Sequence, residues 1–174
     1  MKKLLIFALS LITLTGCSLT QPIPIKGEVV SCTSIKVMAR NGKALDCLDG
    51  TTGVAVDSIA GPALINVWGS WCEPCKQELP HFAHFLAQYG DRVQVIGVDV
   101  EEKSPAVARK FVTTHGMSWP ILYDVNGSTR GKFGMGVPVT WFINTSGKVV
   151  YKKYGPFHSP EEIQLDVIKY LGVK

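Results

Sequence analysis

The sequence contains no run of lysine or arginine residues, and its charges are nearly balanced. Its 174 residues include 18 basic and 14 acidic side chains, which gives a formal charge of +4. Lys2 and Lys3 belong to a segment that we expect to be removed, and without them the charge is +2. Binding to a nucleic acid requires a concentrated positive surface. The composition therefore argues against nucleic acid as a partner.

Long apolar runs are also scarce. The segment 4–14 (LLIFALSLITL) is shorter than the roughly 20 residues of a membrane span, and it follows a positive start, as in a signal peptide. It ends in LTGC, which resembles the lipobox of bacterial lipoproteins. We expect a signal peptide over 1–16, a lipid on Cys17, a tether over 17–28 and one domain over 29–174, held at the membrane outside the cytoplasm. The alternatives are an ordinary signal peptide with a chance cysteine, or an uncleaved anchor.

Cysteine is infrequent, and its count is odd. Once Cys17 carries lipid, the remaining cysteines are Cys32, Cys47, Cys72 and Cys75. Disulfides persist outside the cytoplasm, so we expect these four to form two pairs. Four cysteines permit three connectivities. Proximity along the chain favours Cys32 with Cys47 and Cys72 with Cys75.

Turn signals and apolar patterns divide the domain into elements. The dipeptides Asn41-Gly42 and Asp49-Gly50 predict a β-hairpin with Cys32 and Cys47 on or near its arms. Apolar runs then predict strands at 63–68, 93–100, 119–123, 139–143 and 148–154. Helical spacing and capping residues predict a helix from the cysteines to Gly90, bent at Pro80, and further helices over 104–116 and 159–171. We place Val107 on the buried face of the second helix. This order predicts an α/β sandwich with a mixed sheet.

The stretch WCEPC lies where a buried strand gives way to a helix. Cys72 should therefore sit at a helix N-terminus, where unpaired amides and the helix dipole stabilise negative charge. Thiolate is the reactive form of cysteine, so we expect Cys72 to be the nucleophile. Cys75 lies one turn later and would resolve the mixed disulfide. Pro74 is tolerated because it occupies the first turn.

Other uses of a cysteine pair fit less well. A zinc site needs more ligands, and the sequence has no second CxxC, while His81 is poorly spaced for the role. A structural disulfide in so tight a loop would stabilise the fold little. A peroxidase would need Thr or Ser three residues before the reactive cysteine, where Gly69 stands. We therefore predict redox chemistry without a metal or another cofactor.

These residues resemble the thioredoxin superfamily. The resemblance rests on WCEPC after an apolar strand, on Val137-Pro138 ahead of another strand, and on the strand–helix order. The lipobox, Asn66 within INVW, the stretch CEPCKQELP and the extra helix and strand at 104–123 resemble the TlpA/ResA branch. The resemblance covers about residues 45–172. It implies a thioredoxin-like three-layer sandwich with a mixed β-sheet, an N-terminal β-hairpin extension and a central helix–strand insertion.

The resemblance also implies roles for several residues. Pro138 would be a cis proline beside the disulfide, exposing the Val137 carbonyl to a substrate strand; the alternative is a plain strand-entry proline. Glu78 would tune the cysteines or move a proton; the alternative is a solvated glutamate that serves the helix dipole. Asn66 stands where thioredoxin has a buried proton-shuttling aspartate, so Glu78 would carry more of that role.

Two further residues border the cysteine pair. Glu73 adds negative charge beside Cys72, which should raise the pKa of that thiol and make the disulfide more reducing. We expect Trp71 to line the contact surface; the alternative is core packing. The sequence thus predicts a membrane-tethered reductase of protein disulfides. The resemblance implies apocytochrome c as a substrate and a membrane thiol-disulfide carrier as the reductant. The alternatives are an oxidase that donates its disulfide to secreted proteins, and a metal-delivery module.

Overall fold

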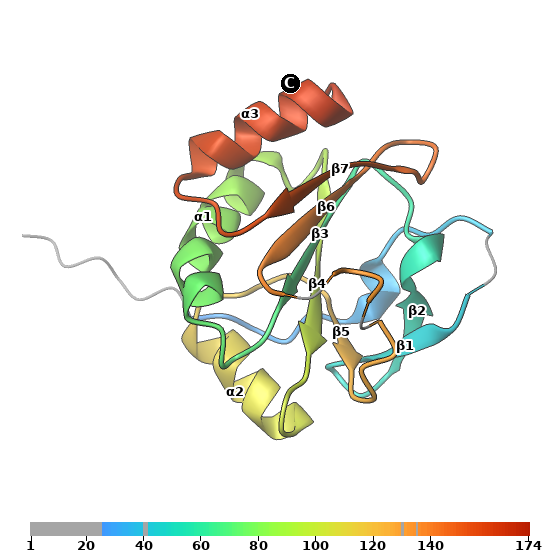
Figure 1. Cartoon of the computed structure of the whole chain (residues 1–174), viewed down its shortest axis with the longest axis vertical. Coiled ribbons are helices and arrows are strands. Elements are labelled where there is room, and N and C mark those ends of the chain that lie inside the picture. Colours follow the sequence, from blue (N-terminus) through green and yellow to red (C-terminus); the bar gives the residue numbers. More distant parts are fainter. Residues whose placement is uncertain (1–25, 40–41, 130, 135) are drawn as a thin grey trace, which may run out of the picture.

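Figure 1 shows a computed structural model that describes residues 26–39, 42–129, 131–134 and 136–174. The predicted signal peptide, Cys17, most of the tether and the turn residue Asn41 lie outside the described residues. In the described part of the chain, no helix is long and apolar enough to cross a membrane.

A seven-stranded mixed sheet, in the order β2-β1-β5-β4-β3-β6-β7, forms the centre of the molecule. Its strands are β1 Ala44–Cys47, β2 Thr52–Ala55, β3 Ala63–Trp68, β4 Gln94–Val100, β5 Ile121–Asp124, β6 Val139–Ile143 and β7 Val149–Tyr154. The central strands β3, β4 and β5 are parallel, and the flanking pairs are antiparallel. Every residue of β3 is buried, as expected for a continuous apolar strand that is covered on both faces.

Three α-helices cover one face of the sheet: α1 Glu73–Tyr89, α2 Pro105–Thr114 and α3 Pro160–Leu171 (Figure 1). The side chains of Leu79, Phe111 and Ile163, one from each helix, share a core with Leu64 and Trp68 of β3. Each helix begins at a residue whose side chain accepts a hydrogen bond from a backbone amide of the first turn; these residues are Cys72, Ser104 and Ser159. Such capping satisfies amides that have no partner within the helix.

Among the described residues, no α-helix covers the other face of the sheet. Two short 3₁₀ helices, η1 Cys32–Ser34 and η2 Val56–Ser58, supply buried side chains, and Phe133 supplies another from the loop before β6. The predicted mixed sheet, N-terminal hairpin and central helix–strand insertion are confirmed, and the third layer consists of 3₁₀ turns and loops.

One local prediction is confirmed and one is wrong. Cys32 lies near the hairpin, as predicted: it belongs to η1, where the Ser31 side chain caps a 3₁₀ turn, and it is bonded to Cys47 on β1. The hairpin joins β1 to β2 through Asp49-Gly50, where Gly50 has a φ of 92°, a conformation that favours glycine. Val107 is 38% exposed, so it does not belong to the buried face of α2. That face is formed by Ala108, Phe111 and Val112, as predicted.

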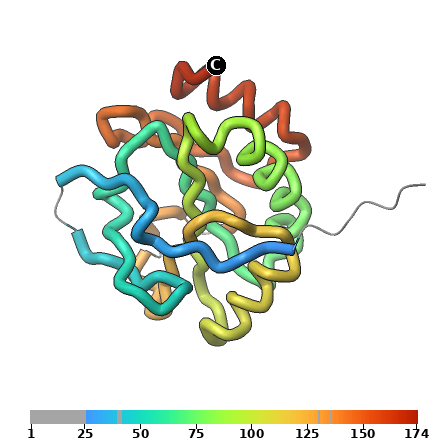
Figure 2. The backbone as a smooth tube through the Cα atoms, turned by 180° about the vertical axis from the view of Figure 1, so that it is seen from behind, coloured from blue at the N-terminus to red at the C-terminus, as the bar shows by residue number. Residues whose placement is uncertain are grey.

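The N-terminal segment is attached to the domain at several points. Figure 2 shows it in blue, crossing the back of the molecule beside the connection from α2 to β5. The amides of Gly27 and Glu28 donate to the carbonyls of Thr113 (3.0 Å) and Met117 (2.9 Å), and Val30 pairs with Pro120. Although the sequence pattern assigns residues 27 and 28 to the tether, these contacts lead us to propose that the domain begins near Gly27.

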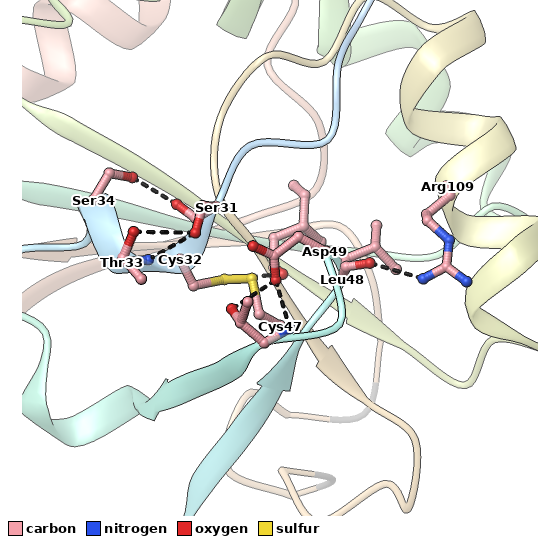
Figure 3. Close-up of a disulfide and its surroundings, with 10 residues drawn as sticks. Ser31, Cys32, Thr33, Ser34, Cys47, Leu48, Asp49 and Arg109 are labelled. Carbon is pink, nitrogen blue, oxygen red and sulfur yellow. Dashed lines mark hydrogen bonds between the residues drawn. A yellow bond between two sulfur atoms is a disulfide. The ribbon is translucent and has the colours of Figure 1, made fainter.

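The Cys32–Cys47 disulfide then joins η1 to the end of β1 (Figure 3). Its Cα atoms are 5.9 Å apart, and the two residues are 2% and 4% exposed. On the other side of Cys47, the Leu48 carbonyl accepts a hydrogen bond of 2.9 Å from Arg109 of α2. The disulfide therefore attaches the N-terminal segment to β1, next to the residue that α2 contacts through Arg109.

We expect the double variant Cys32→Ser/Cys47→Ser to lower the free energy of unfolding by about 3 kcal/mol, because the bond closes a loop of 15 residues. The comparison is made by chemical denaturation in a Cys72→Ser/Cys75→Ser background, so that only this bond differs between the two proteins. Equal unfolding free energies would contradict a stabilising role.

Candidate active site

The Cys72–Cys75 disulfide lies where β3 leads into α1. Cys72 is the N-cap of this 17-residue helix, and its Sγ accepts a hydrogen bond of 3.1 Å from the Cys75 amide. Cys72 is 4% exposed and Cys75 is fully buried. A thiolate at the Cys72 position would be stabilised by that amide and by the helix dipole, because both carry positive charge towards it. Of the pair, Cys72 is the more exposed member.

The loop before Cys72 is held from two sides. The Ser70 amide donates to the Glu102 carboxylate (3.0 Å), and the Cys72 amide donates to the Gly69 carbonyl (3.0 Å). A side chain at Gly69 would lie only 2.5 Å from the Trp71 indole nitrogen, so glycine is needed for the tryptophan to fold back over the loop. Trp71 is 53% exposed, which places it on the surface beside Cys72 and not in the core.

Pro138 lies beside this loop. Val139 pairs with Val67 near the end of β3, so Pro138 precedes β6 next to the strand that leads into the cysteine pair. The Val137–Pro138 peptide bond is cis, and the Pro138 carbonyl accepts a hydrogen bond of 3.0 Å from the Gly155 amide. Trp71, which directly precedes Cys72, and Val137, which directly precedes the cis Pro138, line the same cavity.

Glu78 is fully buried on α1, one turn after Cys75. Its carboxylate accepts hydrogen bonds from the Asn66 side-chain amide (2.8 Å) and from the backbone amide of Phe157 (3.1 Å). Burial raises the pKa of Glu78 from 4.5 to about 7, although both hydrogen bonds oppose the shift. The interpretation of Glu78 as a solvated glutamate is therefore wrong, and its carboxyl group can change protonation state near neutral pH.

Asn66 connects this carboxyl group to the sheet. It is fully buried on β3, and its amide nitrogen also lies 3.3 Å from the hydroxyl of Thr140 on β6. Because Glu78 follows Cys75 by three residues, the two lie on neighbouring positions of the same helix face. The buried polar group under the disulfide thus combines side chains from β3, α1 and β6.

Glu73 and Pro74 occupy the first turn of α1. The Glu73 carboxylate forms an ion pair of 2.8 Å with Lys76, and its side chain is 71% exposed. This neighbouring cation reduces the negative charge that Glu73 presents to Cys72, because an opposite charge at such a distance offsets it. The influence of Glu73 on the thiol is therefore smaller than an unpaired carboxylate would exert.

A second buried acid, Asp99, was missed by sequence reasoning. It lies on β4 between Trp68 of β3 and Tyr123 of β5, and it is fully buried. Neither carboxylate oxygen has a hydrogen-bond partner within the described residues. Burial, with a contribution from Glu102, raises the pKa of Asp99 from 3.8 to about 8. The signal available in the sequence was an acid inside an apolar strand, VQVIGVDV.

Comparison with known proteins places this site in a family. Residues 37–152 match the model of the AhpC/TSA family, and residues 1–18 match a prokaryotic membrane lipoprotein lipid attachment site. The chain therefore belongs to the AhpC/TSA family. A lipid anchors it to a membrane, with the domain on the extracytoplasmic side. The predicted resemblance and localisation are confirmed.

Individual relatives agree with this assignment. The chain is 33% identical over 111 residues to "Thiol-disulfide oxidoreductase ResA" of Bacillus subtilis. The aligned region covers 59% of this chain and 60% of that protein. It is 33% identical over 93 residues to the protein of the same name from Bacillus anthracis, covering 52% and 53%. The matched region spans between half and two thirds of the length of these curated relatives.

Solved structures share the fold. StoA from Bacillus subtilis superposes with a TM-score of 0.60 at 24% identity, covering 71% of this chain and 93% of that chain. The dsbF structure from MTB gives a TM-score of 0.65 at 24% identity, covering 78% and 99%. These likenesses show that the thioredoxin-like arrangement of sheet and helices extends over most of the domain.

Proposed function

We propose that this protein is a membrane-tethered thiol-disulfide oxidoreductase that reduces protein disulfides through Cys72 and Cys75. One observation carries the proposal: the cysteine pair lies at the start of a long helix, and one turn further along that helix Glu78 is fully buried and hydrogen-bonded to Asn66 and Phe157. The activity named for the ResA proteins supports it. In the described part of the chain, no three His, Cys, Asp or Glu side chains gather as a metal site would require.

The reaction proceeds by two exchanges of sulfur. In the reduced protein, the Cys72 thiolate attacks one sulfur of the substrate disulfide, forming a mixed disulfide and releasing one substrate thiolate, which takes a proton from water. The Cys75 thiol then loses its proton and attacks the Cys72 sulfur. This step forms the Cys72–Cys75 disulfide and releases the second substrate thiolate. Two electrons have moved to the substrate, and a dithiol donor restores the protein.

Glu78 is proposed as the acceptor of the Cys75 proton. Cys75 is fully buried, so its thiol has little access to solvent water, and an ionised Glu78 on the same helix face offers a base with a pKa close to the working pH. Asn66 is proposed as a positioning residue, since its amide fixes one oxygen of the Glu78 carboxylate.

Substrates and partners are proposed at a finer level from the family resemblance. Trp71, Val137 and Pro138 border Cys72 and would contact the polypeptide on each side of its disulfide. The proposed substrates are apocytochromes c, whose haem-binding cysteines must be reduced, and the proposed reductant is a membrane thiol-disulfide carrier. The lipid anchor favours partners at the same membrane, because tethering raises their effective concentration.

The test is to trap substrates with Cys75→Ser, which cannot complete the second exchange and should accumulate mixed disulfides at Cys72. Cys72→Ser is the matched control and should trap nothing. Apocytochromes among the trapped proteins would support reduction in cytochrome maturation. A broad set of secreted proteins, together with an oxidising potential of the pair, would show an oxidase instead. Tight stoichiometric metal binding by the reduced domain would favour a metal-delivery module.

A further inference from the structure

The solvent side of α2 carries positive charge and no acid. Residues 103–123 contain no Asp or Glu, whereas Lys103, Arg109 and Lys110 are basic and exposed. Val107 is 38% exposed, and it shares a helix face with Lys110 because the two are three positions apart. We call these four residues the basic surface of α2. Cations beside an apolar side chain are a composition that suits contact with lipid headgroups.

Acidic side chains precede and follow this surface in the chain but do not belong to the helix. Glu101 and Glu102 come before it, and both oxygens of the Glu102 carboxylate accept hydrogen bonds of 3.0 Å from backbone amides. Glu28 is exposed near the C-terminal end of α2, where Lys26 is exposed as well. The charge that α2 itself presents to solvent is therefore positive.

The chain that leads to the lipid leaves the domain beside this helix. Gly27 is buried where a Cβ would collide with the carbonyl oxygens of Val112 and Met117, and its amide donates to the Thr113 carbonyl (3.0 Å). Figures 1 and 2 both show the first described residues next to α2. Gly27 is therefore a fixed point at the C-terminal end of α2, from which the tether departs.

The tether is too short to pass around the domain. The cysteine of the matched lipid attachment site is Cys17, ten residues before Gly27. Ten residues span at most about 36 Å. A domain of residues 27–174 has a radius of gyration of about 15 Å, which corresponds to a sphere about 38 Å across. Gly27 therefore cannot lie on the side of the domain that faces away from the membrane, and the adjoining end of α2 is kept near the bilayer with it.

We propose that the basic surface of α2 docks on the anionic headgroups of the membrane that holds the lipid anchor. Each Lys or Arg near an anionic bilayer is attracted to it, and the attraction decays within a Debye length. The tether keeps the surface within that range, so a few cations are enough to select one orientation of the domain. Val107 adds apolar contact at the level of the headgroups.

This orientation determines where the reactive disulfide lies. The hydrogen bond between the Glu102 carboxylate and the Ser70 amide (3.0 Å) joins the N-terminal end of α2 to the loop that leads to Cys72. With α2 on the headgroups, this loop lies at the edge of the membrane-facing side, where a membrane-bound dithiol donor or substrate can reach Cys72. This consequence rests on the proposed function, whereas the docking itself does not.

The test measures how close two exposed positions of the full lipidated protein lie to a vesicle surface. A fluorophore is attached either at Ala106→Cys on α2 or at Val150→Cys on β7. β7 is an edge strand of the sheet, whereas α2 joins the central strands β4 and β5. Energy transfer to a dye on the lipid headgroups is recorded in vesicles of phosphatidylcholine alone and in an equal mixture with phosphatidylglycerol.

The label must occupy a single position. All of the labelled proteins therefore also carry Cys72→Ser/Cys75→Ser. Cys17 holds the lipid, and the Cys32–Cys47 disulfide is buried, so the introduced cysteine is the thiol that reacts.

In the anionic vesicles, transfer should be stronger from position 106 than from position 150, and this preference should fall in phosphatidylcholine alone and at high salt. Lys103→Glu/Lys110→Glu should lower the ratio of docked to undocked domains at least about 30-fold, because two attractions to the anionic surface are lost. Lys148→Glu/Lys152→Glu makes the same change of charge around β7 and is the matched control, which should keep the native transfer.

Three results would overturn the docking. The first is transfer from position 106 that does not depend on phosphatidylglycerol. The second is transfer that survives Lys103→Glu/Lys110→Glu, or that falls equally in the control variant. The third is transfer that varies with the density of protein on the vesicle and not with its lipid, which would indicate a second copy of the chain on this surface. None of these measurements uses the redox activity, so failure of the docking leaves the proposed function standing.

Discussion

Replacing Glu78 with glutamine should slow the second exchange about 100-fold above pH 7, the loss expected when a general base is removed. In the native protein, Glu78 is ionised above its pKa of about 7 and can accept the Cys75 proton; below that pH it is protonated and cannot. The rate of release from the mixed disulfide should therefore rise as the pH passes through 7. Glutamine keeps the size and hydrogen bonding of the side chain but cannot take up the proton, so the variant should lack this rise.

The measurement is a single-turnover pH profile of product release from a preformed mixed disulfide at Cys72. Glu161→Gln, which changes an exposed glutamate on α3, is the matched control and should keep the native profile. A Glu78→Gln protein that folds normally and retains the inflection near pH 7 would show that another group accepts the proton. A purely structural role for Glu78 would change the unfolding free energy without changing the shape of the profile.

Asp99→Asn should make the protein more stable at alkaline pH, by an amount on the order of 5 kcal/mol at pH 8. Asparagine resembles the protonated acid, so the two proteins should be nearly equal in stability below about pH 4, where Asp99 holds its proton in both the folded and unfolded states. As the pH rises from 3.8 towards 8, the unfolded chain releases this proton while the folded protein retains it. Folding then requires proton uptake, and the native protein loses stability relative to the variant.

Chemical denaturation of the oxidised proteins at several pH values tests this expectation. The difference in unfolding free energy between variant and native protein should grow through the window from pH 4 to pH 8 and level off above it. Asp91→Asn removes a comparable charge at an exposed position and is the control for general charge effects. A difference that does not change with pH would mean that Asp99 is not held in its protonated form by burial.

Two features of the surroundings determine how large this effect becomes. Glu102 lies near Asp99 and opposes its ionisation, while Tyr123 and Arg109 are the other titratable groups that interact across this part of the sheet. Arg109 donates to the Leu48 carbonyl, and no hydrogen bond joins it to Asp99 within the described residues. Asp99 therefore has no hydrogen-bonded cation among the described residues, and burial has the largest effect on its pKa.

Much of the fold follows from neighbouring residues in the sequence. The apolar run ALINVW predicts a strand that is buried throughout, Ser104-Pro105 and Ser159-Pro160 predict helix starts, and the structure contains all three. Each of these signals depends on residues a few positions apart, so it can be recognised without knowledge of the tertiary fold. The segment around Cys32 could not be predicted in this way. The sequence pattern there indicates short extended pieces, whereas the structure has a 3₁₀ turn that the Ser31 side chain caps.

The sequence by itself determined the lipid attachment site, the mixed sheet and the placement of Cys72 at the junction of a strand and a helix, because local pattern and spacing encode all three. Only the tertiary structure decided the protonation of Glu78 and Asp99 and the shape of the cavity beside Trp71. Burial raises the pKa of Glu78, and the hydrogen bonds from Asn66 and Phe157, 12 and 79 residues away in the chain, oppose that shift. The pKa of a buried acid depends on the solvent exposure and charges around it, and these depend on which segments, distant in the sequence, pack together in the folded protein.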